Sequence, residues 1–340
     1  MRPHIIHLYD DSTPGGVTRV LEHMRFSASM TSWARHSLQA VSRNGAMPQL
    51  KADMIVSHLA LSWRRLPALV SFRARHAGTP IIHVEHSYTE AFCALNVPHK
   101  LRFFTMLRTS LALFDKVVAV SAAQAGWLAG RKLVREERLT VIEPMVNLSA
   151  FRAIRAPAGR PRVIGGIGRM HAQKGFDVLI DAFRQLDDPD LRLHLYGRGP
   201  EEAALRALAA GDDRIRFMGF ADPALAMREV DLVAMPSRWE AFGLVALEAR
   251  AAGRPVVCAD TDGLRSSAGP DAVRVATLDA GDWARALRRA TEAEPLAQGR
   301  LGDVESHFPR AWSDLLNEQT GKVEVLPDGL ASATLQAATR

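Results

Sequence analysis

Short apolar runs alternate with amphipathic segments along most of this chain. The runs are rich in β-branched residues and predict buried strands, and the segments between them repeat apolar residues at helical spacing. In the first half, the predicted strands are His4–Tyr9, Asp53–Ser57, Pro80–Glu85, Lys116–Val120 and Leu139–Ile142, and predicted helices lie at Thr18–Arg25, Leu66–His76 and Lys100–Leu113. In the second half, the strands are Arg162–Ile167, Leu191–Tyr196, Arg214–Met218, Asp231–Met235, Pro255–Ala259 and Val273–Ala276, and the helices are Phe176–Leu186, Glu201–Ala210, Pro223–Val230 and Ala241–Ala252.

Strand–helix alternation of this kind predicts parallel sheets with helices on both faces. One stretch, Ser149–Pro161 (SAFRAIRAPAGRP), interrupts the alternation and is typical of a linker. At about 150 residues per domain, a chain of 340 residues also favours two domains. We therefore expect two doubly wound, Rossmann-like α/β domains facing each other across a cleft, at 1–150 and 162–305, joined by residues 151–161.

In such sheets, ligands bind beyond the carboxyl ends of the strands. Polar residues and glycines are concentrated at these positions of the sequence. After the predicted strands come Asp10–Gly16, His58, His86–Ser87, Ser121, Gly168–Lys174, Gly197–Gly199, Gly219–Asp222, Pro236–Glu240 and Asp260–Gly263. This placement predicts a ligand-binding cleft between the two domains.

Composition narrows the class of protein. Apolar residues make up 47% of the chain and charged residues 24%, which excludes a disordered or fibrous protein. No stretch reaches the roughly 18–20 apolar residues of a membrane span, and acidic residues lie where a signal peptide would need an apolar core. The two cysteines, Cys93 and Cys258, form no disulfide framework and match no zinc-site spacing. We expect a cytoplasmic protein.

The positive charge is concentrated in the first half. Residues 1–150 contain 18 Lys and Arg against 10 Asp and Glu, a net charge of +8, whereas the remaining residues contain 25 against 27, a net charge of −2. This asymmetry favours an anionic partner for the first domain, such as an acidic substrate or a lipid headgroup layer. Solvated arginines on an arginine-rich surface are the alternative. The basic residues are scattered and accompany no recognition motif, which argues against nucleic acid.

A glycine-rich segment, Gly165–Gly175 (GGIGRMHAQKG), joins a predicted strand to a predicted helix. Its glycines let backbone N–H groups approach a ligand, and the helix that follows offers its positive N-terminal end. Arg169 and Lys174 add two cations, so the segment fits a diphosphate. It lacks the ending of a Walker A loop and the spacing of a dinucleotide fingerprint. A plain strand-to-helix turn with two exposed cations is the alternative.

A second segment, Pro236–Val257 (PSRWEAFGLVALEARAAGRPVV), carries two glutamates eight residues apart. At about 100° per residue, a helix would place Glu240 and Glu248 toward one side, with Glu240 at the helix start. The apolar residues around them indicate a mostly buried helix, and buried carboxylates need partners. This argues against a solvated helix with capping acids.

Taken together, these motifs resemble the retaining GT-B glycosyltransferases of the family 4 type (glycosyl transferases group 1). The resemblance rests on GRxxxxKG, a YGxGPE-like turn and PSxxEAFGLVxLEAxAxGxPVV, in which the two glutamates match the family's paired-glutamate signature. Pro14–Leu21 (PGGVTRVL) is similar to the family's glycine-rich loop, and His86 to a histidine that follows one of its strands. The likeness spans roughly residues 5–320.

The resemblance implies a role for each matching residue. It assigns the donor diphosphate to Arg169, Lys174 and Gly168, with Gly15 and Gly16 close to the donor phosphates or the acceptor. It assigns the ribose hydroxyls to Glu248, the donor sugar and catalysis to Glu240 and His86, the nearby backbone contacts to Phe242, Gly243, Leu244 and Val245, and the base to Met218 and Ala221 within Met218–Asp222.

The chemistry fits a transfer with retention at the anomeric carbon. The leaving group is an anion, so it needs electrostatic stabilisation more than an acid, and no second carboxylate pair for double displacement is evident. The departing phosphate would take the acceptor proton. The two cations of the glycine-rich segment and the N-terminal end of the following helix would stabilise the diphosphate, so we expect neither a metal nor a cofactor.

Two further histidines follow or end predicted strands in the first half. On a strand, His83 and Glu85 point to one side and Val84 and His86 to the other, so a shared metal site is geometrically poor. His83 is more typical of a buried core histidine, whereas His58 could line the acceptor side. Serine-hydrolase chemistry is unsupported, because no GxSxG elbow follows a strand.

The segment Lys100–Leu113 (KLRFFTMLRTSLAL) alternates basic and apolar residues at helical spacing. It could rest on a membrane surface, and the alternative is a helix packed on the sheet with its arginine stems along apolar neighbours. Residues 306–321 resemble the family's terminal helix, which returns to the first domain. Residues 322–340 are expected to form a flexible tail.

The chain departs from the family pattern at two places. Pro144–Asn147 (PMVN) replaces a frequent Asn-Gly-Val-Asp, and Asp262–Gly269 (DGLRSSAG) replaces a common Gly-Gly-x-x-Glu. The missing glutamate could change how the far end of the donor is held or which sugar fits.

The sequence thus predicts a hexosyltransferase-like enzyme that uses a UDP- or GDP-linked sugar and a saccharide or lipid-linked acceptor, in cell-surface polysaccharide or glycolipid synthesis. The basic first domain would suit peripheral contact with the inner face of the plasma membrane. The alternatives are a non-catalytic GT-B-like binding subunit, or a sugar-nucleotide epimerase or phosphorylase of the same architecture.

Overall fold

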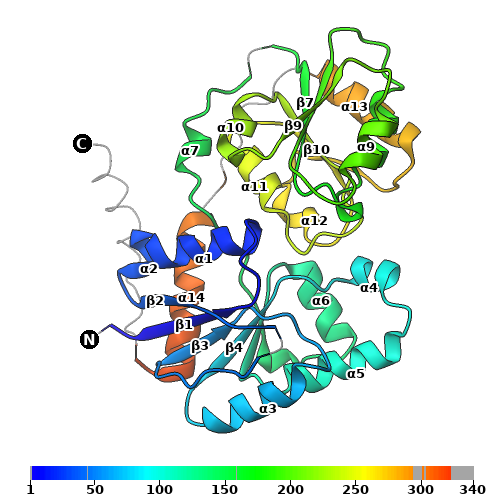
Figure 1. Ribbon diagram of the computed structural model, residues 1–340. Helices are drawn as coiled ribbons and strands as arrows, with labels where there is room; N and C mark the ends of the chain where they lie inside the picture. The colour runs from blue at the N-terminus through cyan, green and yellow to red at the C-terminus, as the bar shows by residue number, and fades with distance from the viewer. Residues whose placement is uncertain (1, 44, 158, 294–300, 302–303, 323–340) are drawn as a thin grey trace, which may run out of the picture. The chain divides into compact units, whose positions relative to one another are not determined.

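The structure is a computed structural model that describes residues 2–43, 45–157, 159–293, 301 and 304–322 (Figure 1). Its described residues form two compact units. The first unit comprises the chain up to Asn147 together with the described residues after Leu301, and the second unit comprises Leu148–Leu301. Each unit is built on one parallel sheet of six strands.

The first sheet has the strand order β2-β1-β3-β4-β5-β6. All of its pairs are parallel. Its strands are β1 (His4–Tyr9), β2 (Arg35–Ala40), β3 (Met54–Ser57), β4 (Ile81–Glu85), β5 (Lys116–Ala119) and β6 (Leu139–Val141). Because the strands are parallel, their carboxyl ends lie at one edge of the sheet.

Helices cover both faces of this sheet. The helices of the first unit are α1 (Gly16–Phe26), α2 (Ala28–Thr31), α3 (Leu66–Arg75), α4 (Glu90–Asn96), α5 (Lys100–Leu111), α6 (Ala122–Gly130), the 3₁₀ turn η1 (Glu136–Arg138) and α14 (Val304–Thr320). Residues of α3 to α6 share one apolar cluster with Ile6 and Leu8 of β1. His7 points to the opposite face, where its ring contacts Trp312 of α14.

The second sheet has the order β12-β11-β10-β7-β8-β9 and is also parallel throughout. Its strands are β7 (Val163–Ile167), β8 (Arg192–Tyr196), β9 (Ile215–Gly219), β10 (Leu232–Met235), β11 (Val256–Ala259) and β12 (Val273–Val275). Central strands β7 and β10 are nearly or fully buried, which matches their continuous apolar sequences.

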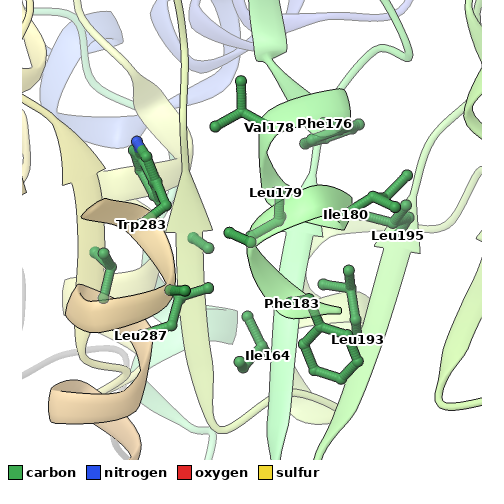
Figure 2. Packing of buried hydrophobic residues seen from close by; sticks show 14 of the residues in the cluster. Ile164, Phe176, Val178, Leu179, Ile180, Phe183, Leu193, Leu195, Trp283 and Leu287 are labelled. Carbon is green, nitrogen blue, oxygen red and sulfur yellow. The ribbon is translucent and has the colours of Figure 1, made fainter. Parts of the chain in front are cut away.

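The helices of the second unit are α7 (Ser149–Arg152), the 3₁₀ turn η2 (Ala172–Lys174), α8 (Phe176–Phe183), α9 (Glu202–Leu208), α10 (Pro223–Arg228), α11 (Leu244–Ala251), α12 (Leu264–Ser267) and α13 (Ala280–Glu292). Figure 2 shows the main core of this unit, in which Leu179 and Phe183 of α8 lie near Ile164 of β7 and Leu193 of β8, and Trp283 of α13 belongs to the same cluster. This core holds rigid the strand ends from which the site loops emerge.

The structure confirms the predicted α/β class with two doubly wound sheets and all eleven strands that the sequence pattern predicts. It adds β2, an edge strand of sequence RHSLQA that is only partly buried and has no apolar run. The predicted linker begins with a short helix, α7, whose Phe151 is buried. The tail expected at 322–340 lies outside the described residues, apart from Lys322.

Candidate active site

Loop 168–175 follows β7, at the carboxyl edge of the second sheet. The Gly168 N–H donates to the Tyr196 carbonyl at 3.0 Å, and the Met170 N–H donates to the Arg198 carbonyl at 2.9 Å. These bonds hold the loop against the turn that follows β8. The loop ends at Gly175, whose φ of +64° lies in the left-handed region, and α8 begins at the next residue. The first N–H groups of α8 therefore face the same end of the sheet as the loop.

Lys174 and Glu240 form an ion pair between loop 168–175 and loop 236–243, which follows β10. The two side chains are only 17% and 13% exposed. Lys174 lies across Gly168, because a Cβ at that glycine would meet the lysine side chain at 3.2 Å. The structure thus brings together Lys174, Glu240 and Gly168, which the sequence predicted as one site.

A second contact between these loops was not foreseen from the sequence. Arg238 donates to both carboxylate oxygens of Asp177, at 2.9 and 2.6 Å, and its backbone N–H donates to the Gln173 carbonyl at 2.8 Å. Burial pushes the pKa of Asp177 upward, but the hydrogen bonds and charge of Arg238 outweigh it and hold that pKa below its usual value. The only sequence signal was an arginine inside the PSRWE segment, next to the predicted glutamate.

The helix after loop 236–243 starts later than predicted. Gly243 has a φ of +97° and caps α11, which begins at Leu244. Glu240 therefore lies in the loop and not at a helix start, and the prediction that Glu240 and Glu248 share one side of a helix was wrong. The loop itself is held by the Gly263 N–H, which donates to the Glu240 carbonyl at 2.9 Å.

The remaining donor-site candidates on α11 and just before it differ in exposure. Glu248 lies in the second turn and its side chain is fully buried. Phe242 is also buried, whereas Leu244 and Val245 are partly exposed at the first turn, where helical N–H groups have no partner within the helix. These N–H groups can donate to a ligand.

Asp262 is the first residue of the segment Asp262–Gly269, which departs from the family pattern. Its φ of +37° is unusual for a residue with a side chain. Its carboxylate accepts a hydrogen bond of 3.3 Å from the Glu240 N–H. The residue that departs from the family pattern therefore contacts the loop that carries Glu240.

Three further candidates lie on the surface of the second unit. Arg169 is exposed on loop 168–175, and the structure shows no ion pair between it and the described residues. Met218 is 43% exposed on the edge strand β9. Ala221 is partly exposed in the turn before α10. All three are accessible to a ligand.

Gly15, Gly16, His58 and His86 belong to the first unit, so the candidates form two groups, one in each unit. Gly15 caps α1, and Thr18 bonds back to its N–H at 3.0 Å. The loop between β1 and α1 is held by Asp10, which pairs with Arg65 at 2.9 Å. Both side chains of this pair are almost completely buried.

His86 follows β4, and His58 follows β3, at the carboxyl edge of the first sheet. His58 Nδ1 and His86 Nε2 are 2.7 Å apart and share a hydrogen bond. Burial lowers the pKa of His58 well below its usual value and lowers that of His86 to about 4. His83 is buried and lies against Phe114, with 4.8 Å between ring centroids, as predicted for a core histidine.

Glu85 is buried beside these histidines. It accepts hydrogen bonds from the Ser87 and Tyr88 N–H groups at 2.8 and 3.0 Å. Burial raises the pKa of Glu85, but His83 and these N–H groups outweigh that effect and hold the pKa below its usual value. Glu85 therefore stays ionised and fixes the chain immediately after β4.

Within the described part of the chain, no three His, Cys, Asp or Glu side chains are arranged to hold a metal ion. The same residues include no helix with the length and apolar character needed to cross a membrane.

Two family models match this chain. Residues 161–293 match the model described as Glycosyl transferases group 1, and residues 4–150 match the one described as Glycosyltransferase Family 4. The D-inositol 3-phosphate glycosyltransferase of Actinosynnema mirum is 31% identical over 287 residues, 75% of this chain and 68% of that protein. The protein of the same name from Thermobispora bispora is 31% identical over 310 residues, 81% and 71% of the two chains.

A third relative, the D-inositol 3-phosphate glycosyltransferase of Salinispora tropica, is 34% identical over 278 residues, 70% of this chain but 56% of that protein. The chain thus matches between about half and two thirds of the length of several such relatives.

Solved structures share the fold. Anabaena HepE in complex with UDP and glucose superposes with a TM-score of 0.66 at 18% identity, covering 99% of this chain and 100% of HepE. Sucrose-phosphate synthase from Thermosynechococcus elongatus gives a TM-score of 0.67 at 18% identity, with the same coverage. The two parallel α/β units are those of a GT-B glycosyltransferase. This chain belongs to the family 4, group 1 glycosyltransferases.

Proposed function

We propose that this glycosyltransferase moves a sugar from a UDP- or GDP-linked donor to an acceptor, with retention of anomeric configuration. The observation that carries the proposal is the Lys174–Glu240 ion pair between two loops at the carboxyl edge of the second sheet. A cation and a carboxylate in contact there fit a diphosphate and a sugar hydroxyl. The complex of Anabaena HepE with UDP and glucose supports a nucleotide sugar as the donor class.

The second unit would bind the donor. Arg169 and Lys174 would neutralise the diphosphate together with the N–H groups of loop 168–175 and the N-terminal end of α8. Glu248 would accept from the ribose hydroxyls. Met218 and Ala221 would contact the base, and the first-turn N–H groups of α11 would face the sugar.

Glu240 would change partners when the donor binds. Without donor it neutralises Lys174. A bound diphosphate carries more negative charge than one carboxylate and would compete for the lysine. Glu240 would then be free to accept hydrogen bonds from donor-sugar hydroxyls, which would orient the anomeric carbon.

The transfer needs electrostatic stabilisation of the leaving group. The bond between the anomeric carbon and the diphosphate oxygen breaks, and the acceptor oxygen bonds to the same face of that carbon. The acceptor hydroxyl proton passes to the departing diphosphate. Arg169 and Lys174 would stabilise the charge that grows on the diphosphate, so transfer should persist in EDTA without a cofactor.

The first unit would bind the acceptor. Gly15, Gly16, His58 and His86 lie at the carboxyl edge of its sheet, and residues 1–150 carry a net charge of +8. Together these features favour an acceptor that carries phosphate. The names of the relatives support a soluble inositol phosphate.

A lipid-linked acceptor has a separate observation in its favour. Leu95 of α4 and Leu101 of α5 are 60% and 83% exposed, and Lys100 and Arg102 beside them are also exposed. Apolar and basic side chains together suit an anionic membrane surface, which would place the enzyme at the inner face of the plasma membrane.

The test is a panel of UDP- and GDP-sugars, measured by thermal shift and then by transfer to inositol 3-phosphate or to a lipid-linked acceptor in anionic vesicles. We expect one nucleotide to raise Tm and one acceptor to be glycosylated with retention. No nucleotide binding would instead favour a non-catalytic subunit. Donor consumption without any acceptor would favour an epimerase, and consumption that requires only inorganic phosphate would favour a phosphorylase.

A further inference from the structure

Four histidines form a continuous hydrogen-bonded row across the first sheet. His36 of β2 bonds through Nδ1 to His7 Nε2 of β1 at 3.0 Å. His7 Nδ1 bonds to His58 Nε2 at 3.0 Å, and His58 Nδ1 bonds to His86 Nε2 at 2.7 Å. Because the strand order is β2-β1-β3-β4, the histidine row links four neighbouring strands and ends at the carboxyl edge of the sheet.

The ring geometry shows that these are in-line hydrogen bonds. Successive ring centroids are 5.3, 5.3 and 5.1 Å apart, and the ring planes differ by 24°, 32° and 25°. Each centroid separation exceeds the matching nitrogen–nitrogen distance by about two ring radii. The nitrogens therefore lie nearly on the line between ring centres, with the rings almost edge to edge.

The rings of the histidine row are neutral near neutral pH. His7, His36 and His58 are buried. Burial lowers the pKa of His7 and His58 far below the usual value, and lowers those of His36 and His86 to about 4. The charged or titratable neighbours that act on the row are His4 at His36, His83 at His58 and His86, and Glu85 at His86.

Counting protons leaves only two arrangements for the row. A neutral imidazole has one N–H and one bare nitrogen, and each nitrogen–nitrogen bond needs one hydrogen. Four neutral rings joined by three such bonds must therefore all carry hydrogen on Nε2, or all on Nδ1. Any mixed arrangement leaves one bond with two hydrogens or with none. The four rings thus have a single, shared tautomeric state.

The two ends of the row differ. At the inner end, His36 Nε2 is buried and makes no hydrogen bond to the described residues. At the outer end, no hydrogen bond from a described residue engages His86 Nδ1.

A closed inner end also prevents the row from switching easily. Converting all four rings from Nε2–H to Nδ1–H requires one proton to enter at His86 Nδ1 and one to leave at His36 Nε2. No described residue bonds to His36 Nε2 to receive it. The state of the row is therefore set by the fold and not renewed with each ligand.

We propose that His36, His7 and His58 are positioning residues that hold His86 in one fixed tautomer, so that His86 Nδ1 presents a fixed hydrogen-bonding character to a hydroxyl group of a bound sugar. The inference rests on the proposed function only for the identity of that ligand. The row thus orients the ligand hydroxyl without using a charged group.

The first test is ¹⁵N NMR of histidine-labelled protein at pH 7, which distinguishes the two tautomers of each ring. We expect the same tautomer on all four histidines of the row. His76 is an internal reference for the Nδ1–H tautomer, because the Leu50 N–H donates to its Nε2 at 3.0 Å and its Nδ1 faces the Phe72 carbonyl at 2.9 Å. Different tautomers among the four rings, or a mixture in any ring, would overturn the proposal.

The second test uses an isosteric pair at the inner end. His36→Asn keeps a polar amide that can bond to His7 Nε2, whereas His36→Leu has no polar group there. We expect H36L to scramble the tautomer of His86 and to lower kcat of sugar transfer about tenfold with an unchanged Kd for the free nucleotide, and H36N to restore both. Equal kcat and an unchanged His86 signal in H36L would refute the role of the row.

The two tests separate this inference from the proposed function. If the wild-type protein transfers no sugar, the proposed function fails, but the NMR signals still decide whether the row holds one tautomer. If transfer is observed and the four rings differ in tautomer, only the inference about the row fails.

Discussion

Arg238 holds Asp177 through two parallel hydrogen bonds, Nη1 to Oδ1 at 2.9 Å and Nη2 to Oδ2 at 2.6 Å. The pair ties loop 236–243 to the first turn of α8, next to the Lys174–Glu240 contact. A planar guanidinium matches a carboxylate in this way, whereas an ammonium cannot. The two side chains are 25% and 44% exposed, so solvent limits their contribution to stability to about 1 kcal/mol or less. Their main effect is on the position of the loops.

We therefore predict that Arg238→Lys weakens UDP or GDP binding about tenfold while lowering Tm only slightly. The lysine keeps the charge but loses the two-point contact, so loop 236–243 is less well placed. Isothermal titration with the nucleotide and a thermal melt measure the two effects. Arg265→Lys is the matched control, because Arg265 of α12 bonds to the Asp260 carboxylate through Nε alone, and its other bond goes to the Asp260 backbone carbonyl. Equal nucleotide affinity in R238K and wild type would contradict the prediction.

Glu240 and Arg169 are expected to have separable roles. Glu240→Ala removes the group that would orient the donor sugar, so transfer should fall by at least about 100-fold, with nucleotide affinity within about threefold of wild type. Arg169→Ala removes a diphosphate contact and should weaken nucleotide binding about tenfold. Steady-state transfer rates and nucleotide titration measure both.

Glu292→Ala, on the exposed end of α13, is the control for loss of one carboxylate. Transfer at the wild-type rate in Glu240→Ala would remove that residue from the mechanism. Unchanged nucleotide binding in Arg169→Ala would remove the arginine from the diphosphate site.

The sequence predicted the strands well because buried parallel strands are continuous apolar runs. It missed β2, where the edge position leaves Arg35 and Gln39 exposed and the pattern is polar. It also placed the start of α11 too early. The apolar residues of loop 236–243 resemble a helix, but a left-handed Gly243 forces the backbone out of helical geometry before Leu244.

The candidate site was predictable only in part. The glycines, Lys174 and Glu240 share short motifs, so their residue types and order pointed to one site. The partners Asp177 and Asp262 carry no local signal, since their roles depend on contacts between segments far apart in the sequence. The histidine row could not be predicted from the sequence for the same reason. Along the chain, His7, His36, His58 and His86 are separated by 22 to 29 residues. In the sheet they follow the order His36, His7, His58, His86, because the strand order is β2-β1-β3-β4.

Gly175 is predicted to be essential for the shape of loop 168–175. A Cβ at this position would lie 2.1 Å from the Pro236 carbonyl oxygen, and the φ of +64° disfavours any side chain. We expect Gly175→Ala to lower the stability of the second unit by more than the roughly 1–2 kcal/mol of left-handed strain alone, and to abolish nucleotide binding because Lys174 precedes the displaced residue. Urea unfolding and nucleotide titration measure these effects.

Gly211→Ala is the matched control. Gly211 has a φ of +84°, but a Cβ there meets no atom within 4 Å. It should lose only the strain of about 1–2 kcal/mol and keep full nucleotide affinity. If both variants lose the same stability, the contact with Pro236 has no energetic effect.

The histidine row predicts a specific loss of stability on acidification. The pKa values of His36 and His86 fall to about 4 on folding, from a usual value of 6.5. Below pH 6.5 these histidines are protonated in the unfolded chain but stay neutral in the folded protein. Their contribution to the free energy of unfolding is therefore complete above pH 6.5 and is lost as the pH falls toward 4. Each such histidine contributes a slope of about 1.4 kcal/mol per pH unit in that window.

The carboxylates with lowered pKa values, such as Asp177 and Glu85, act at lower pH, because their stabilisation is complete above the usual carboxyl pKa and declines only below it. The interval between pH 5 and 6.5 therefore reports mainly on buried histidines. Urea unfolding at half-unit steps of pH measures the slope. In His36→Asn the slope should decrease by about 1.4 kcal/mol per pH unit, because the unfolded variant has one fewer histidine to protonate. An equal slope in that variant would mean that His36 takes up its proton in the folded protein, and the neutral row would then be wrong.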